Sequence, residues 1–101
     1  MDVIMAKIVI VVAIVGAEQI DIIQPRVIAT LGRFSMGYIM NRLGLADQIG
    51  QIGDLHGKEF VAKTDYGSVT IIPLYHPAVA LYDGSNKEII LKDFQVLKKY
   101  I

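Results

Sequence analysis

The sequence predicts an α/β fold in which helices flank a layered, mainly parallel sheet. Two observations predict this class. Short apolar runs rich in β-branched residues, which are typical of buried strands, alternate along the chain with stretches whose apolar residues recur at helical spacing. A strand, helix, strand, helix order also favours parallel pairing through right-handed crossovers.

The composition of the 101-residue chain allows one domain and narrows its chemistry. Hydrophobic residues make up 53% and charged residues 20%, which is too apolar for a disordered chain. Ten Lys and Arg balance ten Asp and Glu, so any contact with nucleic acid must be local rather than driven by net charge. Because the chain has no cysteine, it can form no disulfide and no cysteine-ligated cluster. The two histidines, His56 and His76, show no metal-site spacing, and no metal is expected.

Residues 1–17 form an apolar leader whose origin the sequence leaves open. From Ile8 to Ala17 the residues are continuously apolar and mostly β-branched, which favours a fully buried strand. This run is too short to span a bilayer as a helix, which takes roughly 20 residues. The alternatives are a secretory signal, a helix, or an unnatural start of the reading frame, although Asp2 and a single lysine make a poor charged leader. We expect a cytoplasmic chain without a membrane partner.

The segment AEQIDIIQP predicts a short helix with Ile20, Ile22 and Ile23 on one side. Pro25 should end this helix, because the residue before a proline is pushed out of the helical region. The next segment, RVIATLG, predicts a buried strand followed by a turn at Gly32.

A second helix is predicted over RFSMGYIMNRLG, with its C-cap at Gly44. Its apolar residues at helical spacing are Phe34, Tyr38, Ile39 and Leu43. The glycine-rich segment LADQIGQIGDLHGKEF has no sustained period and predicts a loop with at most a turn of helix.

The last third of the chain predicts a hairpin and an amphipathic helix. Two β-like arms flank DYG in EFVAKTDYGSVTIIPLY, and the second arm is longer and more apolar. The SNKE sequence from Ser85 to Glu88 matches a capping box. Beyond it, one helical stripe contains Ile90, Phe94, Leu97 and Ile101.

His76 and Pro77 follow the apolar run SVTIIPLY, and the pair is either an ordinary turn or part of a site that needs a neutral donor and acceptor. Gly32 likewise follows a predicted core strand. In parallel sheets, ligands bind beyond the carboxyl ends of the strands. We therefore expect Gly32 and His76 to be neighbours.

Three segments carry a resemblance to a known family: QPRVIATLGRFSMGYIM, LHGK and IIPLYHPAVALYDGSNKEIILKDFQVLKKYI. They are similar to the C-terminal half of family-four uracil-DNA glycosylases, and the similarity runs from about Glu18 to Ile101. The resemblance implies a half-domain over residues 18–101 of a base-excision repair protein that flips uracil out of DNA and hydrolyses its N-glycosidic bond.

The resemblance implies a catalytic role for His76, whose neutral imidazole would stabilise the negative charge that develops on the departing uracil. The following segment matches the loop that presses into the DNA minor groove, with Leu81 as the apolar wedge. The residues expected to contact uracil or DNA are Gly32, Arg33, His56, Lys58, Pro77, Ala78 and Leu81.

The sequence also departs from this family. The family's water-positioning motif, its stacking aromatic, its base-reading asparagine and the four cysteines of its [4Fe–4S] cluster have no counterparts in this chain. We expect no cofactor in this chain, and a truncated product or a shortened relative that does not turn over uracil alone. If activity were found, Asp47, Asp54 and Asp65 would be the first carboxylates to test as the water-positioning group. The competing hypothesis is a non-catalytic DNA-binding module, or one that self-associates through an exposed strand edge and apolar faces.

Overall fold

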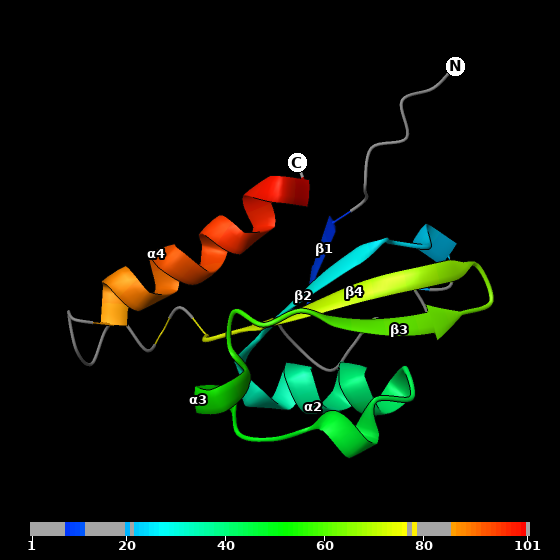
Figure 1. Ribbon diagram of the computed structural model, residues 1–101, viewed down its shortest axis with the longest axis horizontal. Helices are drawn as coiled ribbons and strands as arrows, with labels where there is room; N and C mark the ends of the chain where they lie inside the picture. The colour runs from blue at the N-terminus through cyan, green and yellow to red at the C-terminus, as the bar shows by residue number, and fades with distance from the viewer. Residues whose placement is uncertain (1–7, 12–19, 21, 77, 79–85, 101) are drawn as a thin grey trace.

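The computed structural model describes residues 8–11, 20, 22–76, 78 and 86–100. Its four-stranded sheet has the order β1-β2-β4-β3, formed by β1 (Ile8–Val11), β2 (Val27–Leu31), β3 (Phe60–Thr64) and β4 (Gly67–Leu74). β2 pairs in parallel with β1 and β4, whereas β3 pairs antiparallel with β4. Helix α2 (Gly32–Arg42) and the short α3 (Ile52–Leu55) cover one face, and α4 (Asn86–Val96) covers the other (Figure 1). The predicted α/β class is confirmed.

The pairing of β2 with β4 positions the rest of the molecule. In its register Val27 lies opposite Thr70 and Leu31 lies opposite Leu74, so both strands end at the same edge of the sheet. The sequence favours this central position because parallel strands covered on both faces are continuously apolar and rich in β-branched residues. Gly32 therefore begins α2 at the edge where β4 also ends.

Side chains that alternate along these strands form two cores, one on each face. On the α2 face, Ile28 and Ile71 belong to a cluster with Met36, Ile39 and Met40 of the helix. On the α4 face, the cluster consists of Val27, Ala29, Ile72, Leu74 and Leu97. One layer of helix is thus packed on each face of a single sheet, as predicted.

Helix α2 ends as the sequence predicts but turns a different face to the sheet. Gly44 has φ +81, and the N–H groups of Gly44 and Leu45 donate to the carbonyls of Asn41 (3.3 Å) and Met40 (2.7 Å), a Schellman motif. Phe34, one of the apolar residues named at helical spacing, is 68% exposed. At 3.6 residues per turn Phe34 lies roughly 200° around the axis from the buried Met36. The apolar residues named from the sequence therefore lie on two faces of the helix, and that set omitted the buried Met36 and Met40.

The helical residues 20, 22 and 23 confirm the short helix before Pro25, and the Gln24 N–H donates to the Ile20 carbonyl at 2.8 Å. The prediction that its three isoleucines share one side is wrong. Ile20 is buried, but Ile22 is 80% exposed because residues two apart lie on opposite sides of a helix.

Most of the remaining predictions about secondary structure hold where the structure describes them. The 45–59 segment is mainly loop, as predicted, but it contains two short helical turns rather than at most one, the 3₁₀ turn η1 (Ala46–Gln48) and α3. The hairpin of β3 and β4 is present, and its turn ends at Gly67 with φ +124. The strand expected over 8–17 is present at Ile8–Val11, and its remainder lies outside the described residues. Among the described residues, no helix is long and apolar enough to cross a membrane.

Helix α4 and the 3₁₀ turn η3 (Leu97–Tyr100) form the predicted amphipathic C-terminal element. Ile90 and Leu97 are buried, and Phe94 is only partly buried against the α4-face core. The opposite side of the element faces water, where Lys92, Lys98 and Lys99 are exposed. The predicted capping residue Ser85 and the last stripe residue Ile101 lie outside the described residues.

We predict that Leu97→Ala lowers the free energy of unfolding by about 2–4 kcal/mol, because the buried leucine leaves a cavity between the helix and the sheet. Leu91→Ala is the matched control: Leu91 is 55% exposed on the same C-terminal element, and we expect a change within about 0.5 kcal/mol. Urea unfolding measures both. Equal effects of the two variants would show that the helix does not dock through Leu97.

Glu59 ties the loop before β3 to the C-terminal turn. Lys99 Nζ lies 2.5 Å from Glu59 Oε2, and the Tyr100 hydroxyl donates to the other carboxylate oxygen. The hydrogen bond from Lys99, followed by that from Tyr100, lowers the pKa of the Glu59 carboxyl below its ordinary value. The pair is largely exposed, so solvent and salt screen it.

We predict that wild type is more stable than Glu59→Gln at neutral pH and that this difference disappears in acid. A carboxyl whose pKa is lowered by folding stabilises the fold above its unfolded pKa, about 4.3, and loses that contribution as the pH falls through its folded pKa. Thermal unfolding of both proteins between pH 7 and pH 3, at low and high salt, measures the effect. A difference between the two proteins that does not shrink as the pH falls would contradict the assignment.

Candidate functional site

His76 and Gly32 lie side by side at the carboxyl edge of the sheet, as predicted. A Cβ placed on Gly32 would lie 3.5 Å from the Cβ of His76, which is ordinary van der Waals contact. Gly32 also has φ +87, a left-handed conformation that other residues adopt at a cost in strain. Gly32 is therefore needed for its backbone conformation as the chain passes from β2 into α2.

The turn after β4 fixes the orientation and the tautomer of His76. The backbone N–H of Ala78 donates to His76 Nδ1 at 3.1 Å. Because Nδ1 accepts this hydrogen bond, it holds a lone pair, and the proton of the neutral imidazole sits on Nε2. The side chain is exposed, so the Nε2–H can donate to a ligand.

A cavity of about 390 Å³ opens beside His76 between the ends of the strands and the first turn of α2. Its walls are mainly apolar, and none of its described lining residues is acidic. The lining residues are Leu31, Gly32, Arg33, Phe34, Ser35, Ile52, Tyr75 and His76. The site can thus hold a small flat ring and offer a hydrogen-bond donor to an acceptor atom on its rim.

His56 packs behind this site. Its Nδ1 lies 2.6 Å from Asp93 Oδ2 on α4, and its ring lies 4.4 Å from the Tyr75 ring, measured between centroids. Since an ionised carboxylate only accepts hydrogen bonds, Nδ1 is the protonated nitrogen of His56. Asp93 is 7% exposed. The structure therefore gives His56 a supporting contact under Tyr75, the residue that precedes His76.

Gly57 allows Asp93 to approach this closely. A Cβ on Gly57 would lie 2.8 Å from Asp93 Oδ1, and Gly57 has φ +79. Its N–H donates to the Pro73 carbonyl at 2.8 Å, which joins the loop to the end of β4.

We predict that Gly57→Ala destabilises the protein by at least about 1 kcal/mol, because the methyl group meets Asp93 and the left-handed backbone disfavours it. Gly37→Ala is the matched control, since Gly37 lies within α2 with open space at its Cβ position. That change should stabilise by about 0.5–1 kcal/mol. Urea unfolding gives both values, and a stabilising Gly57→Ala would contradict the close contact.

Of the other predicted site residues, only some lie near the His76 cavity. Arg33 is exposed and lines the His76 cavity, and Lys58 is exposed next to Gly57. Ala78 is half-buried and supplies the hydrogen bond to His76. Pro77 and Leu81 lie outside the described residues.

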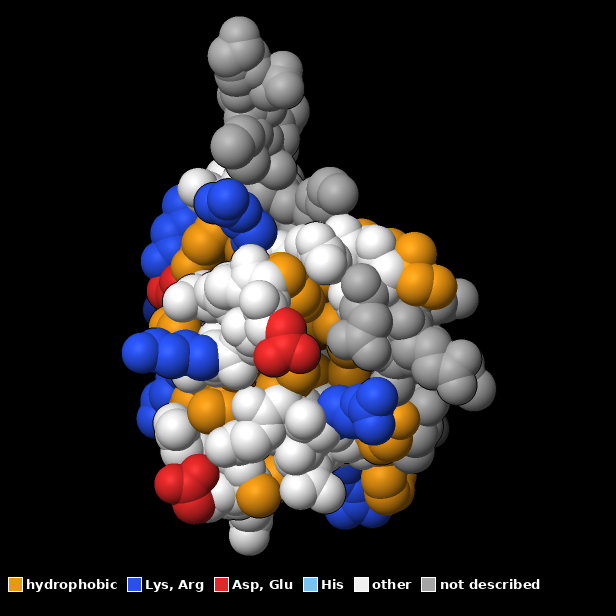
Figure 2. All heavy atoms as spheres, turned by 90° about the vertical axis from the view of Figure 1, so that its right-hand side faces the viewer, with side chains coloured by type: hydrophobic (Ala, Val, Ile, Leu, Met, Phe, Trp, Pro, Cys, Tyr) orange, Lys and Arg blue, Asp and Glu red, His pale blue; other side chains and the backbone are white. Residues whose placement is uncertain are grey.

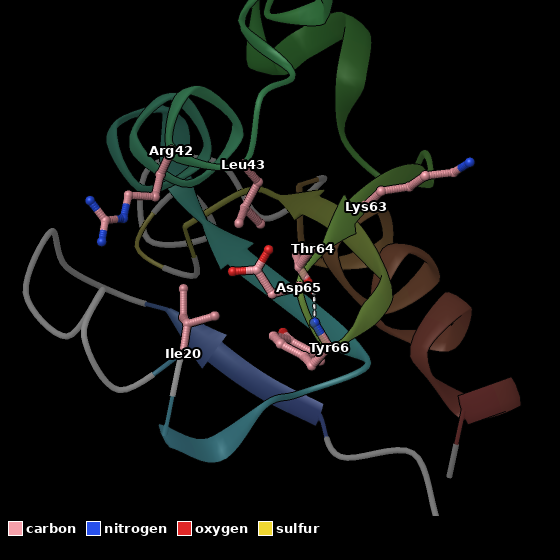
Figure 3. Close-up of a pocket in the computed structure, with 7 residues that line it drawn as sticks. All are labelled: Ile20, Arg42, Leu43, Lys63, Thr64, Asp65 and Tyr66. Atoms are coloured by element: carbon pink, nitrogen blue, oxygen red, sulfur yellow. Dashed lines mark hydrogen bonds between the residues drawn. The ribbon is translucent and has the colours of Figure 1, made fainter.

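A second cavity, of about 290 Å³, lies at the opposite end of the sheet, near the hairpin turn and the end of α2. Three of its described lining residues are charged. Asp65 points toward its centre, whereas the side chains of Arg42 and Lys63 extend away from it (Figure 3). The face that Figure 2 shows, at this end, mixes basic and acidic side chains with hydrophobic ones. Asp65 is thus remote from His76, whereas Asp54 lies in α3, two residues after the Ile52 that lines the His76 cavity.

Sequence reasoning missed three residues of the site: Phe34, Tyr75 and Asp93. The sequence does contain a pattern that indicates the buried position of Asp93. This residue is the one carboxylate inside the apolar stripe, three residues after Ile90 and four before Leu97. Such a residue should face the sheet and need a partner there. Among the described residues, no group of three or more His, Cys, Asp or Glu could hold a metal ion.

Comparison with known proteins places the chain in a family. Residues 17–99 match the model of the uracil DNA glycosylase superfamily, and the chain belongs to this superfamily.

Three relatives carry the description type-4 uracil-DNA glycosylase. The protein of Sulfurisphaera tokodaii is 38% identical over 82 residues, covering 81% of this chain and 36% of the relative. That of Saccharolobus solfataricus is 35% identical over 83 residues, covering 81% and 37%. That of Archaeoglobus fulgidus is 34% identical over 78 residues, covering 77% and 38%. The matched part of this chain thus spans little more than a third of each relative.

Proposed function

We propose that the chain binds uracil-containing DNA and places His76 against the uracil, in the position from which it would stabilise the departing base in a complete glycosylase. The observation that carries this proposal is the orientation of His76: the Ala78 N–H occupies Nδ1, which leaves the Nε2–H as a neutral donor next to the cavity. Membership of the uracil DNA glycosylase superfamily supports uracil in DNA as the ligand.

The chemistry assigned to His76 is electrostatic. When the C1′–N bond breaks, its electron pair moves into the base, and negative charge builds on a uracil carbonyl oxygen. The Nε2–H donates a hydrogen bond to that oxygen, while a water oxygen forms the new bond to C1′. The proton that this water loses passes through solvent to the released uracil anion, which leaves as neutral uracil. A neutral donor does this without the cost of burying a charge.

The other contacts we propose serve to hold the DNA. Gly32 lets the backbone approach the base, and Arg33 and Lys58 face phosphates. The segment that includes Pro77, Ala78 and Leu81 presses against the minor groove. His56, by contrast, acts through Tyr75 and Asp93 and is assigned no direct contact with DNA.

The chain has no cysteine and therefore supplies no thiolate ligand to an iron–sulfur cluster.

We predict that His76→Ala weakens the hold on the uracil base rather than on the DNA backbone. The measurement compares the affinity for a duplex containing uracil with that for the same duplex carrying an abasic analogue at that position. Losing one neutral hydrogen bond of about 0.5–1.5 kcal/mol should shrink the ratio of the two affinities roughly 2- to 13-fold. His76→Asn keeps a neutral N–H donor and should retain more of the ratio. An unchanged ratio in His76→Ala would contradict the assignment.

The same preparations should be tested for release of labelled uracil. We expect release close to background, and binding in the micromolar to millimolar range that weakens as salt is added. Multiple-turnover release that His76→Ala abolishes would overturn the expectation of low activity, and Asp54 would then be the first carboxylate to replace.

The second candidate function is a non-catalytic module that self-associates. It is favoured by the exposed Val61 on β3, the strand at one edge of the sheet. Sedimentation velocity over a range of concentrations separates the two: a monomer without DNA supports the first function, and a concentration-dependent dimer supports the second.

A further inference from the structure

We propose that Phe34, together with the hollow beside it, forms a subsite for the nucleobase adjacent to the one held at His76, and that Arg33 faces the phosphate between them. This inference rests on the proposed function and adds a second base position to it.

The first observation is an exposed aromatic ring paired with a cation. Phe34 is 68% exposed in the first turn of α2, on the side of the helix that faces away from the core. The guanidinium carbon of Arg33 lies over the ring, 4.8 Å from its centroid. Exposed rings with neighbouring arginines are what single-stranded nucleic acid binds, because every base can stack and every phosphate is an anion.

The second observation is that the hollow adjoins the His76 cavity. A depression of about 590 Å³ lies beside Phe34 and shares Arg33, Phe34 and Ile52 with that cavity. Its other described lining residues are Met36, Ile49, Gly50, Gln51 and Gly53. A strand with one base at His76 would therefore meet Phe34 next.

The charges of this surface select the ligand. Arg33 is the only charged side chain among the described lining residues of either depression. An apolar trough with one cation at the junction of its two hollows suits two flat rings joined by a phosphate. Burial of Phe34 against a second copy of this chain would place two Arg33 side chains near one another, so we favour the nucleobase.

The test uses a fluorescently labelled single-stranded oligonucleotide with one deoxyuridine, titrated with the full chain at low salt. By anisotropy, Phe34→Ala should bind about 5- to 150-fold more weakly, the range expected for one stacked base. Phe34→Leu should lose nearly as much, and Phe34→Trp should keep the affinity. Leu91→Ala is the matched control, an exposed apolar residue on α4, and should bind as wild type does.

Phe34→Trp gives a direct readout because the chain contains no other tryptophan. Its fluorescence should be quenched as the oligonucleotide binds. Replacing the nucleotide next to the deoxyuridine with an abasic analogue should abolish the quenching. That replacement should also weaken wild type and leave Phe34→Ala unchanged, since both changes remove the same contact.

The outcomes separate this inference from the proposed function. Binding by anisotropy without tryptophan quenching would overturn the subsite and leave DNA binding standing. Quenching with an unchanged base-to-abasic ratio in His76→Ala would support the subsite and contradict the role of His76. No binding at all would overturn both. Self-association that Phe34→Ala removes, without quenching by DNA, would show that the surface serves a second copy instead.

Discussion

The parallel pairing of β2 with β4 is the constraint on which the rest of this structure depends. Its register ends both strands at one edge, with Leu31 opposite Leu74, and so brings Gly32 and His76 into contact across 44 positions of sequence. Both strands are covered on two faces over most of their length, which is why most of their residues are apolar. A shift of two residues in this register would keep the faces and the two cores but would separate the start of α2 from the turn that holds His76. The apolar core alone does not define the site, because the alignment of the strand ends is also required.

The layer on the other face of the sheet is connected to the site through a buried carboxylate. Asp93 lies within the apolar stripe of α4, and burying it without a partner would cost several kcal/mol. His56 supplies the hydrogen-bond partner that the carboxylate needs, and the His56 ring in turn packs on Tyr75. A leucine at position 93 would pack α4 against the sheet without a polar contact. The carboxylate, by contrast, connects α4 to His56 in the loop after α3, and through that ring to Tyr75 at the end of β4. We interpret the polar contact as one that fixes the position of α4 along the sheet more than it adds to stability.

Local patterns were sufficient to predict the elements, and topology was sufficient to predict one long-range contact. The strand VIATL, the turn at Gly32 and the hairpin follow from residue types within a few positions of each other. The meeting of Gly32 with His76 follows from the rule that parallel strands align their ends. The side of Ile22 was predicted wrongly and the exposure of Phe34 was not predicted, since an apolar residue on a helix can face either way and only the packed partners decide. The domain boundary at residue 18 and the contacts of Leu81 stay predictions.

The two histidines show why some parts of a site can be read from sequence and others cannot. The tautomer of His76 is set by a backbone N–H two residues away, so it is a property of the turn that any sequence adopting this turn would share. The tautomer of His56 is set by Asp93, 37 positions later, and depends on how α4 packs against the sheet. The first histidine therefore keeps its donor as long as the turn is intact, while the second needs the whole fold. The group assigned to the chemistry relies on the shorter-range contact, and the longer-range one supports it from behind through Tyr75.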